Sequence, residues 1–367
     1  MRKIFLCVIP ILFAGCGCNT PTEPNSNDRP PEISRGIAVI TTDALFSASG
    51  FGIIDVVGGS VYENLIQGSL HTDLAVRTYG SDVYILERMG RDNIIKYDSK
   101  KMGVAYHENL GAGINIQDIA VVSQTKAYIS CNSSKDLIVF NPHSGKKTSV
   151  IDLSAYNAGE ASHPYASAVA VYGHYVYVAC QRFITDNYGD QELGQVVIID
   201  SRADTIVNVI TLEKKNPHSM DIFHDRLLVA SAGHWLEPSS GGVEMIDLTA
   251  NINLGVVADM DGASRVAFIS LNKAYVGAGI FDENWNYSAK IFPINPQART
   301  TGAALNYIGD GFGGIVYDGF RVYIGEQDYE NSGVGVVVVN PATDAFETKI
   351  LVAAPMMPAG LGVILRE

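Results

Sequence analysis

Three histidines and two aspartates have the side chains most suited to chemistry. His71, His163 and His218 each precede a short apolar run within a few residues, and Asp73 and Asp118 stand immediately before two such runs. A carboxylate beside an imidazole can act as an acid–base pair, and three imidazoles can bind zinc. Because no spacing typical of metal ligands occurs, we predict no metal site. Asp73 or Asp118 with His71 or His218 is the one acid–base combination that the sequence suggests.

Other catalytic motifs do not occur in the sequence. It contains no His-Glu-x-x-His, no Gly-x-Ser-x-Gly and no phosphate-binding loop. Carboxylate pairs that cleave glycosidic bonds form in space rather than in sequence, so with abundant acidic residues that possibility stays open. The sequence therefore identifies neither a catalytic residue nor a cofactor.

A repeat of strand-like segments must position these side chains. Tyrosines in Tyr-Ile or Tyr-Val pairs recur at intervals of roughly 45–50 residues or twice that, and Leu228 fills the double interval. Apolar runs that end in Asp or Asn recur in parallel, which gives seven units of four strands, the pattern of a β-propeller. The tyrosines are Tyr84, Tyr128, Tyr177, Tyr275 and Tyr323, and the runs end at Asp55, Asp98, Asn141, Asp200, Asp247, Asn295 and Asn340.

The two ends of the chain are predicted to share one blade. The N-terminal unit has only outer strands, whereas an extra inner-strand sequence, Leu361-Gly-Val-Ile364, stands at the C-terminus. Pairing these segments would close the ring and remove an exposed sheet edge. We predict an all-β, seven-bladed β-propeller closed by a C-terminal inner strand on the N-terminal blade.

The repeat resembles that of a known family. Tyr177-Val-Ala-Cys180, Tyr128-Ile-Ser-Cys131, Tyr275-Val-Gly-Ala278 and Tyr323-Ile-Gly-Glu326 are similar to the YVTN-type, YncE-like propeller repeat of bacterial surface and periplasmic proteins. The resemblance covers the whole folded region and implies an extracytoplasmic binding or scaffolding propeller. Some lipoproteins of this broad group capture corrinoids at the cell surface. The chain departs from the family in lacking Thr-Asn after Tyr-Val and in having longer loops between the second and third strands of several blades.

These longer loops and the starts of the inner strands lie on one face of a propeller. They place charged, amide and aromatic groups around a concave mouth, the usual location of a ligand site. Exposed aromatic side chains there can stack on sugars, planar cofactors or peptides, although packing of loop against loop is an equal alternative. The predicted ligand-binding residues are His71, Asp73, Gln117, Asp118, His163, His218, Trp235, Arg265, Trp285, Tyr287, Phe312 and Tyr329.

The N-terminus has the pattern of a bacterial lipoprotein signal. Arg2 and Lys3 precede an apolar run over residues 4–13, and the small residues Ala14 and Gly15 precede Cys16. We expect a signal peptide over residues 1–15, a lipidated Cys16 that begins a polar tether over residues 16–35, and the propeller over residues 36–367. An ordinary secreted protein is the alternative, and Cys18 is a second candidate for the lipid. The expected location is extracytoplasmic, at the outer membrane or cell surface.

Charge and cysteines limit the partners. The chain has 26 basic and 39 acidic residues, a net charge of −13, so nucleic acid is excluded as a partner and a neutral or cationic ligand is favoured away from Arg265. Cys131 and Cys180 occupy the same position of adjacent units, too far apart for a disulfide.

The sequence favours a non-enzymatic lipoprotein propeller that binds a small molecule, glycan or protein on its loop face, with corrinoid capture as a special case. A hydrolase or lyase acting on a polysaccharide or lactone through the central funnel is the alternative.

Overall fold

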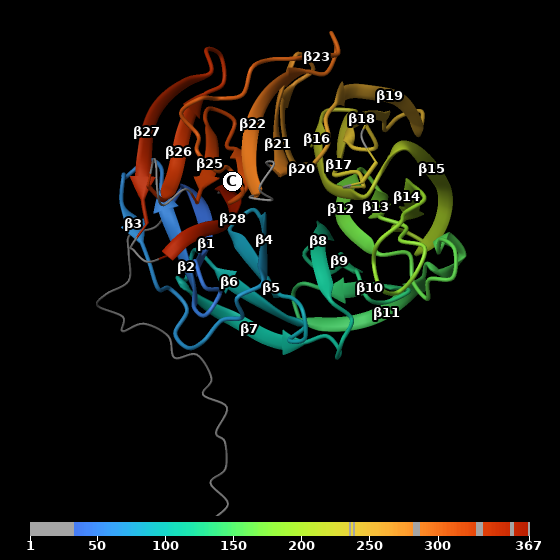
Figure 1. Cartoon of the computed structure of the whole chain (residues 1–367). Helices are drawn as coiled ribbons and strands as arrows, with labels where there is room; N and C mark the ends of the chain where they lie inside the picture. The colour runs from blue at the N-terminus through green and yellow to red at the C-terminus, as the bar shows by residue number, and fades with distance from the viewer. Residues whose placement is uncertain are drawn as a thin grey trace, which may run out of the picture.

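Seven antiparallel sheets of four strands each form the molecule. The computed structural model describes residues 33–234, 236–237, 239–281, 287–327, 333–352 and 356–365, and the sheets stand around a common axis (Figure 1). The predicted seven-bladed β-propeller is therefore confirmed. Within the described ranges, no helix is long and apolar enough to cross a membrane.

Each blade runs from an inner strand to an outer strand. Blades 1 to 4 comprise β28 (Met356–Leu365), β1 (Arg35–Asp43), β2 (Ser49–Asp55) and β3 (Val61–Tyr62); β4 (Leu74–Tyr79), β5 (Asp82–Glu87), β6 (Asn93–Asp98) and β7 (Gly103–Asn109); β8 (Ile116–Ser123), β9 (Lys126–Cys131), β10 (Asp136–Asn141) and β11 (Lys146–Asp152); and β12 (Ala166–Tyr172), β13 (Tyr175–Cys180), β14 (Leu193–Asp200) and β15 (Thr205–Lys215). Blades 5 to 7 comprise β16 (Pro217–Phe223), β17 (Arg226–Ser231), β18 (Gly242–Asp247) and β19 (Ile252–Asp259); β20 (Ala263–Ser270), β21 (Lys273–Phe281), β22 (Tyr287–Asn295) and β23 (Thr300–Thr301); and β24 (Ile315–Tyr317), β25 (Val322–Glu326), β26 (Gly335–Asn340) and β27 (Ala345–Leu351). One short 3-10 helix, η1 (Ser154–Tyr156), precedes β12.

Ring closure occurs in blade 1, as predicted. β28 pairs with β1 in antiparallel register from Arg35–Leu365 to Asp43–Met356, and the last and first strands lie side by side in Figure 1. Ile364 is completely buried and Leu361 is nearly so. The C-terminal strand thus supplies the inner edge that the N-terminal segment lacks.

The core lies between neighbouring blades. One cluster joins Tyr128 and Val139 of blade 3 to Val169 and Val178 of blade 4, and similar clusters fill the other interfaces. Both faces of a blade are buried in this way, which explains the nearly continuous apolar runs in the middle strands. Cys131 and Cys180 end β9 and β13 as free, buried thiols.

Candidate functional site

A channel along the propeller axis forms a large cavity in the described part of the structure. Its volume is about 600 Å³, and every blade contributes to its wall. Because an inner strand starts where its neighbouring second strand ends, the loops between the second and third strands surround one mouth of the channel. The hairpins between the first and second strands surround the opposite end.

The structure brings half of the predicted binding residues to the channel. These residues come from the starts of the inner strands of blades 2, 3, 5 and 6 and from the loop before β24. They are Asp73, Gln117, Asp118, His218, Arg265 and Phe312.

His71 and His163 do not line the channel. The amide of His71 donates to Glu87 Oε1 at 2.8 Å, and its Nδ1 lies 3.2 Å from the backbone nitrogen of Asp73. The ring of His163 packs on Tyr165 with 4.2 Å between ring centroids, and its Nδ1 lies 2.8 Å from Ser162 Oγ. Both histidines therefore organise loops outside the channel.

The other predicted residues are Tyr287, Trp235, Trp285, Tyr329 and Cys16. Tyr287 is the first residue of β22, where its backbone pairs with Phe281. Trp235, Trp285, Tyr329 and Cys16 lie outside the described residues.

Asp73 is held by an arginine at the mouth. Arg88 follows β5, and its Nε donates to Asp73 Oδ1 at 2.9 Å while its Nη2 donates to the same oxygen. The third donor, Nη1, reaches Gln117 Oε1 at 3.0 Å. This set joins blade 2 to blade 3 and occupies the carboxylate of Asp73. Arg88 was not predicted, although its position directly after a second strand is a usable signal.

Asp118 joins three blades. Its Oδ1 lies 2.7 Å from Arg77 Nε of β4, and its Oδ2 accepts the amide proton of Val169 in β12 at 3.1 Å. Only 4% of Asp118 is exposed. These two contacts join the carboxylate to the inner strands of blades 2 and 4. Asp118 therefore holds the inner strands in place.

Asp221 is a channel carboxyl that the sequence analysis missed. Its Oδ2 accepts from the amide of Phe268 in the next blade at 2.7 Å, and its Oδ1 accepts from Ile222 at 2.9 Å. Enclosure by protein raises the pKa of Asp221 to about 6, although its two amide partners and Arg77 lower it. Alignment of the second-strand tyrosines would have found this residue, because the equivalent inner-strand positions elsewhere are Arg77, Ala120, Ala170, Ala267, Val316 and Gly362.

His218 is positioned by a chain of amides. Gln181 Nε2 lies 3.2 Å from His218 Nε2, Asn132 Nδ2 donates to Gln181 Oε1 at 2.8 Å, and Tyr188 Oη donates to Asn132 Oδ1 at 3.0 Å. The imidazole is exposed to the channel while protein surrounds the channel on all sides. This enclosure, together with the positive charges of Arg265 and Arg88, lowers the pKa of His218 to about 4. His218 is therefore neutral at pH 7.

Arg265 belongs to β20 of blade 6, whereas the amides that position His218 come from blades 3 and 4. His218 of blade 5 therefore stands between them in blade order. The Arg265 guanidinium stands over the ring of Phe312, 5.3 Å from the centroid, and its Nη1 donates to Ser264 O at 2.9 Å. The strand starts next to Gly262, whose φ is +76° and where a Cβ would lie 1.9 Å from Gly279 O. Only glycine fits this close approach, which fixes the start of β20 against the end of β21.

Two loop aromatics pack against each other. Phe183 and Tyr188 lie 5.0 Å apart between ring centroids, and each contacts Tyr165. Phe183 is buried, whereas 49% of Tyr188 is exposed. For this loop, packing of loop on loop is the correct alternative.

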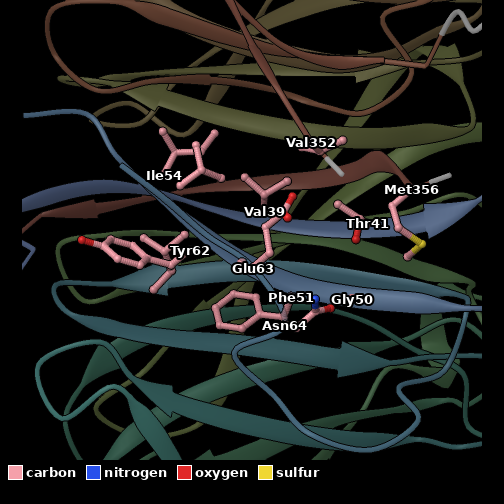
Figure 2. Close-up of a pocket in the computed structure, with 13 residues that line it drawn as sticks. Val39, Thr41, Gly50, Phe51, Ile54, Tyr62, Glu63, Asn64, Val352 and Met356 are labelled. Carbon is pink, nitrogen blue, oxygen red and sulfur yellow. The ribbon is translucent and has the colours of Figure 1, made fainter. Parts of the chain in front are cut away.

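A second, smaller cavity of about 180 Å³ lies in blade 1 beside the end of blade 7. Figure 2 shows Phe51, Tyr62, Val352 and Met356 around it, with Glu63 among the few polar groups. Its wall is mostly apolar and holds none of the predicted binding residues.

The predicted acid–base pairs do not form. Asp73 and Asp118 are bound by Arg88 and Arg77, and neither carboxylate has a hydrogen bond with His71 or His218 among the contacts that the structure shows. Across the described ranges, no three His, Cys, Asp or Glu side chains gather in a way that could hold a metal ion. The channel mouth offers hydrogen bonding, charge and an aromatic ring.

Comparison with known proteins supports the fold. No family model and no curated protein matches the chain. Among solved structures, it is similar to hydrazine synthase of Kuenenia stuttgartiensis, with a TM-score of 0.58 and 16% identity over 75% of this chain and 80% of that one. It is also similar to U3-55K, with a TM-score of 0.55 and 10% identity over 83% of this chain and 95% of that one. At these identities the similarity shows the β-propeller fold alone.

Proposed function

We propose that this protein is an extracytoplasmic lipoprotein of the YncE-like type that binds a ligand, without catalysis, at the mouth of its channel. The convergence of polar and aromatic side chains from separate blades on one cavity carries the proposal. The basic, apolar and small-residue order before Cys16 supports the location. A glycan or a corrinoid-like cofactor is included among the candidate ligands.

Binding is favoured over hydrolysis or elimination by the state of the carboxylates. A general acid or base must exchange a proton with the substrate. Asp118 is buried against Arg77 and an amide, Asp73 is bound by Arg88, and Asp221 accepts from two amides. Each of these carboxylates is thus engaged in a structural contact, and a substitution that removed the carboxylate would leave its arginine or amide partner unsatisfied.

A thermal-shift screen of the protein against glycans, corrinoids, haem and divalent metal ions tests this function. A ligand that binds only the folded state stabilises it, by about 2.7 kcal/mol when the free ligand concentration is a hundred times Kd. The melting temperature rises as a result. We expect the shift to be lost in Arg265→Gln. It should persist in the matched control Arg202→Gln, since Arg202 lies at the opposite face in the turn after β14 and is bound to Asp200. Equal shifts in the two variants would place the site away from the mouth.

A further inference from the structure

We infer that the channel binds a ligand with an alkylammonium group, with the cation beside Asp221 of β16 and the rest of the ligand towards the mouth. The inference rests on the proposed function and specifies the chemical class of its ligand. Asp221 lies three residues beyond His218 on the same strand, roughly 10 Å deeper in the channel. A cationic ligand also agrees with the net charge of −13.

Asp221 repeats an arrangement that Asp118 shows in blade 3. Each carboxylate accepts from the amide of the residue that follows it and from an amide in the inner strand of the next blade. Asp118 has a further partner, the guanidinium of Arg77, with Nε 2.7 Å from Oδ1. Among the described residues, no basic side chain forms an ion pair with Asp221. A cationic ligand would complete at Asp221 the arrangement that Arg77 completes at Asp118.

The described channel wall carries six charged side chains, three of each sign. They are Asp73, Arg77, Arg88, Asp118, Asp221 and Arg265. Arg88 is bound to Asp73, and Arg265 stands over the ring of Phe312 at the mouth. Arg77 is the charged side chain that acts on the pKa of Asp221, and Asp118 offsets its charge through two contacts. Within this described wall, Asp221 is therefore the carboxylate that no arginine contacts.

The environment of Asp221 favours a cation without N–H groups. Enclosure by protein is the main cause of its raised pKa of about 6, so the carboxylate has lost part of its hydration. A cation beside it restores a favourable interaction for the ionised form. Because each carboxylate oxygen already accepts one amide, a quaternary ammonium group, which carries charge and needs no hydrogen-bond acceptor, suits the site.

Three aromatic residues line the channel near Asp221. Phe223 lies two residues further along the same side of β16, and its ring is 5.7 Å from that of Phe268 in β20, with 46° between the ring planes. Tyr317 of β24 adds a third ring, and its hydroxyl donates to Gly319 O at 2.7 Å. Phe223 and Tyr317 are partly exposed. Aromatic rings attract quaternary ammonium ions, and the carboxylate adds a full opposite charge.

Isothermal titration calorimetry with choline and with its neutral isostere 3,3-dimethyl-1-butanol tests the inference. We expect choline to bind at least tenfold tighter than the alcohol, with an affinity that falls as salt rises. Asp221→Asn, which keeps the size of the side chain and one acceptor oxygen, should remove this preference. The matched control Asp225→Asn should retain it, because Asp225 lies in the β16–β17 hairpin and pairs with Arg226 at the surface.

The pH dependence of choline binding is a second measurement, and it needs no variant. Protonation of Asp221 removes its charge, so with a pKa of about 6 the affinity should fall roughly tenfold from pH 7 to pH 5. His218 is neutral over this range because its pKa is about 4, and the arginines of the channel keep their charge. In Asp221→Asn this pH dependence should disappear.

Three results would overturn the inference: equal affinities for choline and the alcohol, choline binding that Asp221→Asn leaves intact, or no choline binding. The proposed function would still stand if a glycan or a corrinoid raised the melting temperature of the wild type and not that of Arg265→Gln. If neither choline nor any ligand of that screen bound in the channel, both would fail. If Asp221→Asn melts below Asp225→Asn, the two ligands and the pH series on the wild type decide.

Discussion

Some charged residues of this propeller are buried and hold loops in place. Glu87, at the end of β5, is completely buried, and its carboxylate accepts from the His71 amide, from Asn93 Nδ2 at 2.7 Å and from His107 Nε2 at 3.1 Å. Burial alone raises the pKa of Glu87, but the bonds from His107, Asn93 and His71 outweigh burial and lower it to about 2. Glu87 therefore fixes the backbone at His71, two residues before Asp73 at the channel mouth.

Replacement of Glu87 should change how stability depends on pH. A carboxyl whose pKa is lower in the folded state stabilises the fold fully above its unfolded pKa of about 4.5, and this contribution disappears as pH falls from 4.5 towards 2. We expect Glu87→Gln to cost on the order of 3 kcal/mol at pH 7, measured by urea unfolding, and much less near pH 3.

Glu108→Gln is the control for that experiment, because Glu108 lies on outer strand β7 and pairs with Lys146 at the surface. Its cost should stay under about 0.5 kcal/mol. A cost for Glu87→Gln that is the same at pH 7 and pH 3 would show that the loss is steric.

At the scale of elements, the repeating tyrosines have a function beyond filling the core. The hydroxyls of Tyr128, Tyr177 and Tyr275 donate to Asp204, Asn251 and Asp344 of the following blade. Each acceptor stands in the turn between the third and fourth strands, with φ of +55°, +54° and +58°. Asp and Asn tolerate this left-handed conformation, so one residue type satisfies both the turn and the tyrosine. The repeat therefore joins each of these blades to the next.

Substitution of the hydroxyl tests this interblade bond. Burial raises the pKa of Tyr128 well above its usual range, so the hydroxyl stays protonated and donates to Asp204. We expect Tyr128→Phe to destabilise the protein by at least about 1 kcal/mol.

Tyr84→Phe is a matched control, because the turn of the next blade has Gly145 at the acceptor position and Tyr84 instead reaches Asp82 of its own blade at 3.5 Å. Its cost, from the same denaturation curves, should be smaller. Equal costs would mean that the tyrosines stabilise through their rings alone.

The same periodicity explains what could be predicted. Strand number, inner-strand positions and ring closure follow from apolar spacing, which reports burial directly. The spacing also placed Asp118, His218 and Arg265 at the channel. It could not show that Glu87 would bind the His71 amide, or that Phe183 and Tyr188 would pack on Tyr165, since those contacts depend on loop conformation. Comparison of polar exceptions at each repeat position would have added Arg77 and Asp221.

At the scale of the whole molecule, stability depends on the joining of its two ends. Removal of the chain from Pro358 onward would delete most of β28, expose the partners of Leu361 and Ile364, and remove the acceptor of Thr78 Oγ1 at Val363 O. Burial at about 25 cal/mol per Å² makes this a loss of several kcal/mol. We expect the melting temperature to fall by roughly 10 °C or more, or the protein to become insoluble. Deletion of Arg366 and Glu367 alone is the control, and an unchanged melting temperature after the longer deletion would contradict closure.

The anchor and the mouth are expected on opposite faces of the ring. β1 begins at Arg35, which pairs with Leu365, lies 3.5 Å from Asp318 Oδ2 and stands over the ring of Phe320 at 4.5 Å. Asp318 and Phe320 belong to the β24–β25 hairpin, at the end of the channel away from the mouth. A lipid on Cys16 would therefore attach the propeller by its hairpin face and direct the mouth away from the membrane.

The site of the lipid is tested by substitution of the two cysteines. Cys16→Ser should release the protein from the membrane fraction, whereas Cys18→Ser should not. Release by Cys18→Ser instead would assign the lipid to Cys18.

Fluorescent labels on the two faces test this orientation. Burial raises the pKa of Cys131 and Cys180 to about 12, so in a Cys18→Ser background only an introduced cysteine should react. Leu45→Cys places a label in the β1–β2 loop at the mouth, and Leu271→Cys places one in the β20–β21 hairpin. On protein bound to vesicles that contain nitroxide lipids, the label at position 271 should be quenched more strongly, because quenching falls with distance from the bilayer. Equal quenching would mean that the tether lets the propeller turn freely, and stronger quenching at position 45 would reverse the assigned orientation.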